Sequence, residues 1–216
     1  MAISNLSNGL RTGVCTFANR PTTPYEGQVI YETDTDLSYI WGGTAWQQVS
    51  GGTAVGNSGL VLVKSQTIGN SVTSVEVTSA FSATYDNYLI QVNGGSSTSN
   101  SSDLRLQMGS TVSSYRYQLI YGAWAGTPLA EGSSTAVNFV YTGSMTTTGA
   151  AMNCFVFNPF LATQTRVWAN YNAGYTSDVG TVSGLLNNST QYTSFTLVIN
   201  TGTLTGGTIR VYGYRQ

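Results

Sequence analysis

The side chains that could do chemistry are few, because the chain of 216 residues contains no histidine. Histidine is the commonest general base of enzymes and the commonest metal ligand. A pair of carboxylates could still hydrolyse a glycosidic bond, but the sequence offers no reason to pair any two of its nine acids across a cleft. We therefore expect no catalytic residue, no bound metal and no cofactor. The acids are Glu26, Glu32, Asp34, Asp36, Glu76, Asp86, Asp103, Glu131 and Asp178.

Three of these acids, Glu32, Asp34 and Asp36, stand at alternate positions. On an extended strand they would share one face and could offer oxygen ligands to a hard cation such as Ca²⁺. The same residues favour a hairpin turn in which aspartate side chains accept backbone hydrogen bonds. The glycine and the distal glutamate of an EF-hand loop are absent at the required offsets. We therefore interpret the segment as a turn.

Two segments that resemble loops carry aromatic side chains, Tyr121 and Trp124 in YGAWAGTP and Tyr171 and Tyr175 in NYNAGYTSD. Exposed rings there could stack on the sugars of a host glycan. The same rings could instead pack over the ends of a sandwich or at a contact between subunits, because aromatic side chains dominate core and interface burial. We favour packing and keep these four residues as candidates for contact with a receptor or with another subunit.

The composition argues against a charged partner. Only 8% of the residues are charged, the formal net charge is -1, and the eight basic residues are spread along the whole chain. Binding of nucleic acid or of an anionic membrane needs clustered lysine and arginine, so we expect neither. Surfaces of nearly zero net charge tend to associate. We therefore expect the protein to assemble with copies of itself, as a homotrimer.

No targeting or membrane-spanning segment is apparent. The first residues, MAISNLSNGL, lack the basic start and apolar core of a signal peptide. No apolar run approaches the roughly 18 residues that a membrane span needs. Cys15 and Cys154 form no metal-binding or redox spacing, so we expect free thiols. These features predict synthesis in a host cytoplasm and no insertion into a membrane.

Short runs of alternating polarity with turn residues between them recur from residue 60 onward, and no long segment shows the helical period. Spacing of this kind predicts an all-β fold, an antiparallel two-sheet β-sandwich over residues 60–216. In the clearest strands one face is apolar and should point into the core, as with Phe195, Leu197 and Ile199. The predicted strands are 60–67, 72–78, 88–92, 104–108, 115–121, 136–141, 152–157, 165–170, 181–185, 194–199 and 208–214.

The first 49 residues read differently. Residues 1–27 show no regular period and predict an extended arm, which another chain would hold in place. Residues 28–49 read as a three-stranded β-meander that has too few aliphatic residues to be stable alone in water. Trp41 and Trp46 flank the turn at Gly42 and Gly43. They could form the meander's own small core, anchor it on a neighbouring subunit, or do both. Residues 50–59 have the composition of a flexible linker.

The pattern RPTTPYEGQVIYETDT followed by WGGTAW resembles a segment common in structural proteins of tailed-bacteriophage virions, near the start of fibre and head-decoration proteins. The resemblance implies that residues 1–49 anchor the protein to a virion, and we take Arg20, Tyr31, Trp41 and Trp46 as candidate anchoring residues. The residues that carry the resemblance are Arg20, Pro21, Pro24, Gly27, Gln28, Tyr31, Thr33, Asp34, Trp41, Gly43 and Trp46.

A looser resemblance covers the rest of the chain. The segments FSATYDNYLIQVNG, LRLQMGS and GTIRVYGY look like jelly-roll domains of phage head-decoration and tailspike proteins. Together the two resemblances imply a capsid decoration, or cement, protein on the outer surface of the head. Its partners would be copies of itself, the major capsid protein or another virion protein, with a host surface glycan as a further candidate.

Two alternatives stay open. The first is a short tail fibre or tailspike whose sandwich binds a receptor. A fibre normally has a long repeating shaft, and the expected linker spans only about ten residues, so we rank decoration first. The second is a carbohydrate-binding or carbohydrate-active protein, against which the missing signal peptide and the missing histidine argue.

Overall fold

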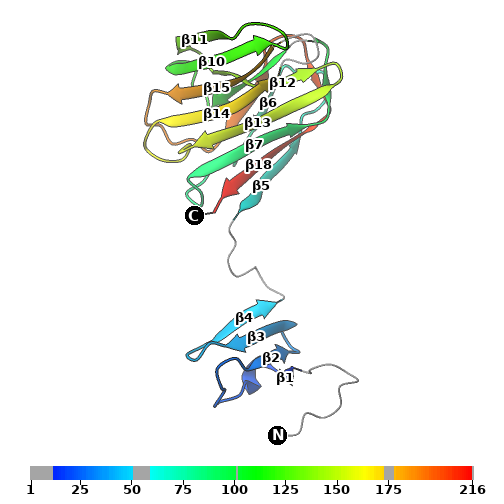
Figure 1. The fold of residues 1–216 in the computed structure, drawn as a ribbon, viewed down its shortest axis with the longest axis vertical. Helices are drawn as coiled ribbons and strands as arrows, with labels where there is room; N and C mark the ends of the chain where they lie inside the picture. Colours follow the sequence, from blue (N-terminus) through cyan, green and yellow to red (C-terminus); the bar gives the residue numbers. More distant parts are fainter. Residues whose placement is uncertain (1–11, 51–58, 101, 173–177, 216) are drawn as a thin grey trace. The chain divides into compact units, whose positions relative to one another are not determined.

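The computed structural model describes residues 12–50, 59–100, 102–172 and 178–215. The chain divides into two compact units, Met1–Ser58 and Gly59–Gln216 (Figure 1). Both units are built from β-strands, and the only helical element among the described residues is one turn of 3-10 helix, η1 (Phe17–Asn19). The described part of the chain contains no helix of the length and apolarity that crossing a membrane requires.

The first unit is a four-stranded sheet with the order β1-β2-β3-β4. Three of its strands, β2, β3 and β4, form the predicted antiparallel meander. Strand β1 pairs with β2 in parallel, and Val14 stands opposite Tyr31. Part of the expected arm therefore pairs with the meander of its own chain, whereas residues 1–11 lie outside the described residues. The strands are β1 (Gly13–Cys15), β2 (Val29–Glu32), β3 (Leu37–Trp41) and β4 (Trp46–Ser50).

Very little apolar surface is buried in this first unit. Among its described residues, the only buried side chains are Ile30, which is 1% exposed, and Glu32, which is 0% exposed. Burying one aliphatic side chain contributes only about 1.5–3 kcal/mol. Hydrophobic burial within the unit therefore stabilises it only weakly.

The second unit is a β-sandwich in which every named pairing is antiparallel, so the predicted fold class is confirmed. Eight strands form one sheet in the order β11-β10-β15-β14-β13-β7-β18-β5, seen from top to bottom in Figure 1. Four strands form the other in the order β12-β9-β16-β6. The strands are β5 (Leu60–Thr67), β6 (Ser74–Val77), β7 (Asn87–Asn93), β8 (Ser96–Ser97), β9 (Asp103–Met108), β10 (Tyr115–Ala123), β11 (Leu129–Ala136), β12 (Phe139–Thr146), β13 (Gly149–Phe157), β14 (Thr165–Asn172), β15 (Asp178–Leu186), β16 (Phe195–Ile199), β17 (Leu204–Thr205) and β18 (Thr208–Tyr214).

Strand β12 connects the two sheets. Its last residues, Ser144 to Thr146, pair with β13 in the eight-stranded sheet. Its earlier residues pair with β9 in the four-stranded sheet, with a register shift between Phe139 and Gly143. One strand therefore takes part in both sheets, and the irregularity lies where the chain passes from one pairing to the other.

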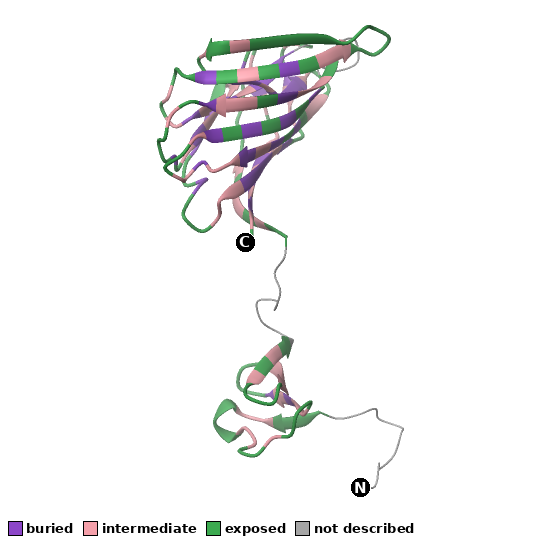
Figure 2. Ribbon diagram, turned by 60° about the vertical axis from the view of Figure 1, so that its left-hand side comes forward, coloured by how far each residue is buried: buried purple, intermediate pink, exposed green. Residues whose placement is uncertain are grey.

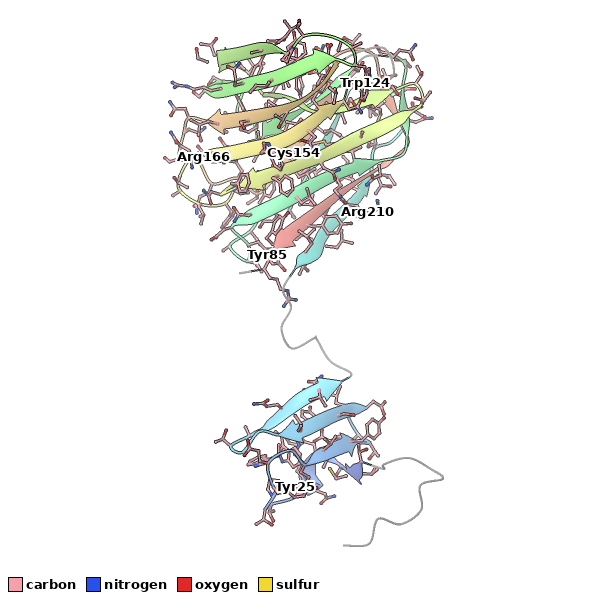
Figure 3. The ribbon with its side chains drawn as sticks, viewed as in Figure 1. Tyr25, Tyr85, Trp124, Cys154, Arg166 and Arg210 are labelled. Atoms are coloured by element: carbon pink, nitrogen blue, oxygen red, sulfur yellow. The ribbon has the colours of Figure 1, made fainter. Side chains whose placement is uncertain are left out.

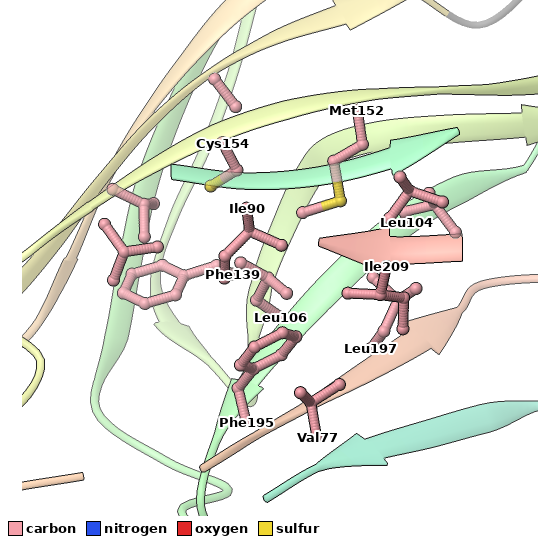
Figure 4. Close-up of a cluster of buried hydrophobic side chains, with 14 of the residues drawn as sticks. Val77, Ile90, Leu104, Leu106, Phe139, Met152, Cys154, Phe195, Leu197 and Ile209 are labelled. Atoms are coloured by element: carbon pink, nitrogen blue, oxygen red, sulfur yellow. The ribbon is translucent and has the colours of Figure 1, made fainter. Parts of the chain in front are cut away.

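The core fills the space between the sheets. Buried and exposed residues alternate along the strands (Figure 2), because successive side chains of a strand point to opposite faces. Phe195 and Leu197 of the smaller sheet and Ile90 and Cys154 of the larger one are buried together in this core (Figure 4). Burial raises the pKa of the Cys154 thiol. Both cysteines are free, as expected.

Each predicted strand of the sandwich overlaps an observed strand, but three strands were not predicted. Strand β11 was missed because its sequence, LAEGSSTA, has almost no apolar alternation. Strands β8 and β17 are two residues long and pair with each other. The polar connection between β7 and β9 is partly buried. Ser97 and Ser102 are buried there, and the Ser102 hydroxyl donates to the carbonyl of Thr201 at 2.8 Å.

The two-sheet core generates a stability prediction. Leu106→Ala removes a side chain that is 0% exposed, so the free energy of unfolding should fall by about 2–5 kcal/mol. Val112→Ala, at a position that is 59% exposed, should change it by less than about 0.5 kcal/mol. Urea unfolding followed by circular dichroism measures both. Equal stability of the two variants would contradict the assignment of Leu106 to the core.

Candidate functional site

Arg20 lies at the centre of the first unit. Its Nε donates a hydrogen bond to Oε1 of Glu32, and the Thr35 hydroxyl donates to the other carboxylate oxygen at 2.9 Å. The guanidinium carbon lies 4.7 Å from the ring centroid of Phe17 and 4.2 Å from that of Tyr39, within the range of a cation–π contact. One arginine therefore ties the segment before the meander to β2 and β3.

The charges of this pair shift each other's pKa. The hydrogen bond from Arg20 lowers the pKa of Glu32, against the opposing effect of burial. The same bond raises the pKa of Arg20. Burial raises the pKa of the neighbouring Cys15 thiol, and the charge of Glu32 adds to that shift. Glu32 is thus held as a carboxylate inside the unit, where an unpaired charge would be costly.

The other two alternating acids have separate partners. Both carboxylate oxygens of Asp34 accept from the backbone N–H of Phe17, at 3.0 and 3.1 Å. Asp36 accepts from the hydroxyl of Tyr31 at 2.8 Å, and this bond raises the pKa of Tyr31. The geometry supports the turn interpretation. Within the described residues, no three or more acidic, cysteine or histidine side chains form a group that could hold a metal ion.

Trp41 and Trp46 face each other across β3 and β4. Their ring centroids are 5.5 Å apart in an edge-to-face arrangement, and both side chains are half-buried. Of the four candidate anchoring residues, Arg20 and Tyr31 are therefore bonded within the unit, and the two tryptophans pack on each other. Their role in anchoring stays a prediction.

The four aromatic candidates of the sandwich do not form one site. Tyr171 is buried at 7% exposure, and its ring centroid lies 5.0 Å from that of Tyr141. Tyr121 is half-buried and packs against the core. It and Tyr171 stand opposite Gly180 on the two strands that neighbour β15. Trp124 is 63% exposed in the turn between β10 and β11 (Figure 3). Tyr175 lies outside the described residues.

A hollow that the sequence did not reveal lies between β11 and β12. It has a volume of about 280 Å³ and is bounded by residues of β9, β10, β11 and β12. We call it the β11–β12 hollow. Its polar and aromatic lining includes Arg105, Tyr117, Glu131, Ser133, Asn138 and Tyr141.

Glu131 is the hub of this hollow. Its carboxylate accepts from the hydroxyl of Tyr117 at 2.9 Å and from that of Tyr141 at 3.0 and 3.1 Å. Burial and the bond to Glu131 together raise the pKa of Tyr117 to about 12 and that of Tyr141 further. Both hydroxyls therefore stay protonated and remain donors at neutral pH. Arg105 is paired with Asp103 at 2.6 Å, so Glu131 gives the hollow its net negative charge.

Two features of the hollow are unusual. Tyr141 has a backbone φ of 57°, in the left-handed region that a bulky residue rarely adopts. Asn138 is 7% exposed, and its buried Oδ1 accepts no hydrogen bond from the described residues. Buried polar atoms nearly always have a partner. Strain of this kind gathers at functional sites, so this hollow is the stronger candidate site of the sandwich.

Comparisons of the chain with protein-family models, with curated proteins and with solved structures found no match.

The buried ion pair predicts acid sensitivity of the first unit. The folded pKa of Glu32 lies below its ordinary value of 4.5, so its carboxylate stabilises the fold above that pH. This contribution is lost as the pH falls through the folded pKa. The midpoint of thermal unfolding of the first unit should therefore stay level down to about pH 5 and fall below it.

Tryptophan fluorescence in a W124F/W168F background, which leaves Trp41 and Trp46 as the reporters, follows this unit alone. Glu32→Gln should lower the midpoint at neutral pH and flatten its dependence on acid. Glu26→Gln removes an exposed carboxylate of the same unit and should keep the wild-type profile. A wild-type profile in Glu32→Gln would show that the Arg20–Glu32 pair does not stabilise the unit.

Proposed function

We propose that the protein is a structural component of a tailed-phage virion, a capsid decoration protein whose first unit attaches to the head and whose sandwich projects from it. The exposed surface of the first unit is the observation that carries this proposal. Val14, Phe17, Tyr25 and Val49 are 67%, 62%, 71% and 55% exposed, whereas Ile30 alone is a buried apolar side chain of the unit's described residues. Figure 3 labels Tyr25 in this unit.

This distribution is typical of a unit that a partner completes. A small sheet with one buried aliphatic side chain gains more stability by burying its outer apolar residues against another protein than it holds by itself. Large aromatic and aliphatic side chains also supply most of the binding energy at interface centres. The proposed partner is the major capsid protein or another protein of the virion.

The residues that carry the resemblance to virion proteins have structural roles within this unit. Arg20 and Asp34 bond to other segments of the unit. Gly27 and Gly43 have φ angles of 84° and 90°, which glycine adopts without strain. The motif therefore specifies the fold of a small module and supplies no reactive group. Such a role fits attachment better than catalysis.

Self-association has a candidate surface on the outer face of the eight-stranded sheet. Trp168, Phe155, Leu89, Tyr212 and Leu62 stand opposite one another on five successive strands. Trp168 and Leu62 are 42% and 52% exposed, and the ring of Phe155 stacks on that of Trp168 at 5.2 Å. This apolar row crosses five of the eight strands, and Leu89 within it is 6% exposed. It supports the proposed homotrimer, since exposed apolar patches mark interaction sites.

A receptor-binding protein of the tail is the second candidate, favoured by the β11–β12 hollow, whose tyrosines and acid suit a sugar. Hydrolysis of that sugar is not proposed. Glu131 already accepts two tyrosine hydroxyls, and the other acid nearby, Asp103, is paired with Arg105. Among the described residues that line the hollow, Glu131 has no second carboxylate beside it for glycoside chemistry.

The number of copies per particle decides between head and tail. Quantitative mass spectrometry of purified virions should find hundreds of copies of a decoration protein. A handful would place the protein in the tail and contradict the decoration role. Labelled antibody seen by electron microscopy on the head surface gives the matching spatial test.

Attachment through the first unit is testable by substitution. Tyr25→Ala combined with Val49→Ala removes two exposed apolar side chains, and we expect binding to heads that lack the protein to weaken about tenfold or more. The matched control, Val112→Ala with Ile120→Ala, removes side chains of the sandwich that are 59% and 57% exposed. It should bind as the wild type does. Co-sedimentation measures both variants, and undiminished binding of the first would place the anchor elsewhere.

A further inference from the structure

Strand β11 carries polar residues on its inward face, unlike β10 beside it. Glu131 stands opposite Leu119 of β10, and Ser133 stands opposite Tyr117. Residues opposite each other on paired strands point to the same side of the sheet, and Leu119 points into the core at 1% exposure. Glu131 and Ser133 therefore face inward, at the edge of the eight-stranded sheet, where the β11–β12 hollow opens.

The tyrosines of the hollow form a continuous aromatic wall. The ring centroids of Tyr117 and Tyr141 are 6.0 Å apart, and those of Tyr141 and Tyr171 are 5.0 Å apart, each pair close to edge-to-face. Tyr117 and Tyr141 are half-buried, and both line the hollow. Glu131 accepts a hydrogen bond from each of their hydroxyls, which favours this orientation of the two rings before any ligand arrives.

The backbone of β12 is strained at the residue that carries one of these rings. Tyr141 lies in the register shift between Phe139 and Gly143, with φ at 57°. Bulges of this kind redirect side chains and are common beside active sites. A glycine at this position would adopt the same backbone without strain. What calls for an explanation is therefore the presence of an aromatic side chain at position 141 in place of glycine.

Protection of the sheet edge explains only part of the site. An inward-pointing charge on an edge strand prevents pairing with other chains, and Glu131 alone would serve that purpose. It does not account for the strained Tyr141 or for the buried Oδ1 of Asn138, which lines the same hollow and accepts no bond from the described residues.

We propose that the β11–β12 hollow binds one pyranose residue of an uncharged glycan. The apolar face of the sugar packs on the rings of Tyr117 and Tyr141, as ligands with apolar faces do in sites with a few placed polar groups. Its hydroxyls donate to the carboxylate of Glu131. The volume of about 280 Å³ suits a single sugar residue.

The charge of the hollow selects against acidic sugars. Arg105 is neutralised by Asp103, and Glu131 leaves a net negative charge. A uronic or sialic acid would place a second carboxylate near Glu131, which costs binding free energy through like-charge repulsion. This inference goes beyond the proposed attachment to a virion and does not depend on it, since the hollow lies wholly within the sandwich.

Saturation-transfer NMR on the full chain tests the proposal. The probes are the methyl glycosides of glucose, galactose, mannose, N-acetylglucosamine and N-acetylgalactosamine, with methyl glucuronoside and N-acetylneuraminic acid as acidic probes. At least one neutral glycoside at millimolar concentration should receive saturation. Transfer to the acidic probes alone, or to no probe, would overturn the proposal.

Variants assign the binding to this hollow. Glu131→Gln keeps the size of the side chain and should raise the dissociation constant of the bound glycoside at least tenfold. Tyr141→Gly relieves the backbone strain and removes the ring, so it should abolish saturation transfer. Glu76→Gln, an exposed acid of β6 outside the hollow, should bind as the wild type does.

A melting temperature and a near-ultraviolet dichroism spectrum separate loss of binding from loss of fold. Glu131→Gln is read at a temperature at which its spectrum matches that of the wild type. Unchanged affinity in folded Glu131→Gln would reject the hollow as the binding site. The glycoside assay uses no virion, so a negative result would not contradict the attachment proposal. In the same way, a negative result in the head-binding test would not contradict the glycan proposal.

Discussion

Strand β12 is the element on which the sandwich depends, because it pairs with β13 at its last residues and with β9 at Phe139, Gly143 and Ser144. A sheet of this width must close over its own apolar face, and the chain does so by transferring one strand from the larger sheet to the smaller. The transfer breaks the register between Phe139 and Gly143. That irregularity places Tyr141 in its strained conformation, so the constraint that closes the core also shapes the β11–β12 hollow.

The first unit relies on a different interaction. With Ile30 as the one buried aliphatic side chain of its described residues, the unit is organised around the Arg20–Glu32 ion pair. Ion pairs of this kind stabilise a fold weakly, but removing one partner leaves a costly unpaired charge. Such a pair therefore selects one arrangement of Arg20, β2 and β3, and its net contribution to stability is small. A unit of this kind is well defined in shape, and the proposed partner would add to its stability.

The low charge of the chain connects the two proposals. With 8% charged residues, the protein has few groups for ion-pair networks or for long-range attraction of a partner. The interactions that the two proposals use involve apolar residues, tyrosine hydroxyls and single acids. The proposed attachment uses apolar side chains, among them Tyr25 and Val49. The proposed recognition of an uncharged sugar uses the tyrosines Tyr117 and Tyr141. Neither interaction should depend strongly on salt.

The sequence by itself determined the strands whose side chains alternate. The pattern of Phe195, Leu197 and Ile199 marks an inward face whatever the strand pairs with, because the period of two is a local property of the backbone. The meander is equally local, since its turns at Asp34–Asp36 and Gly42–Gly43 are short-range signals. Only the tertiary structure decided which strands are neighbours. Glu131, Tyr141 and Asn138 carry no shared local signal, and β11 is too polar to be recognised as a strand. They meet because β11 lies at the edge of one sheet and β12 crosses to the other, and pairing between distant segments depends on the packing of the whole core.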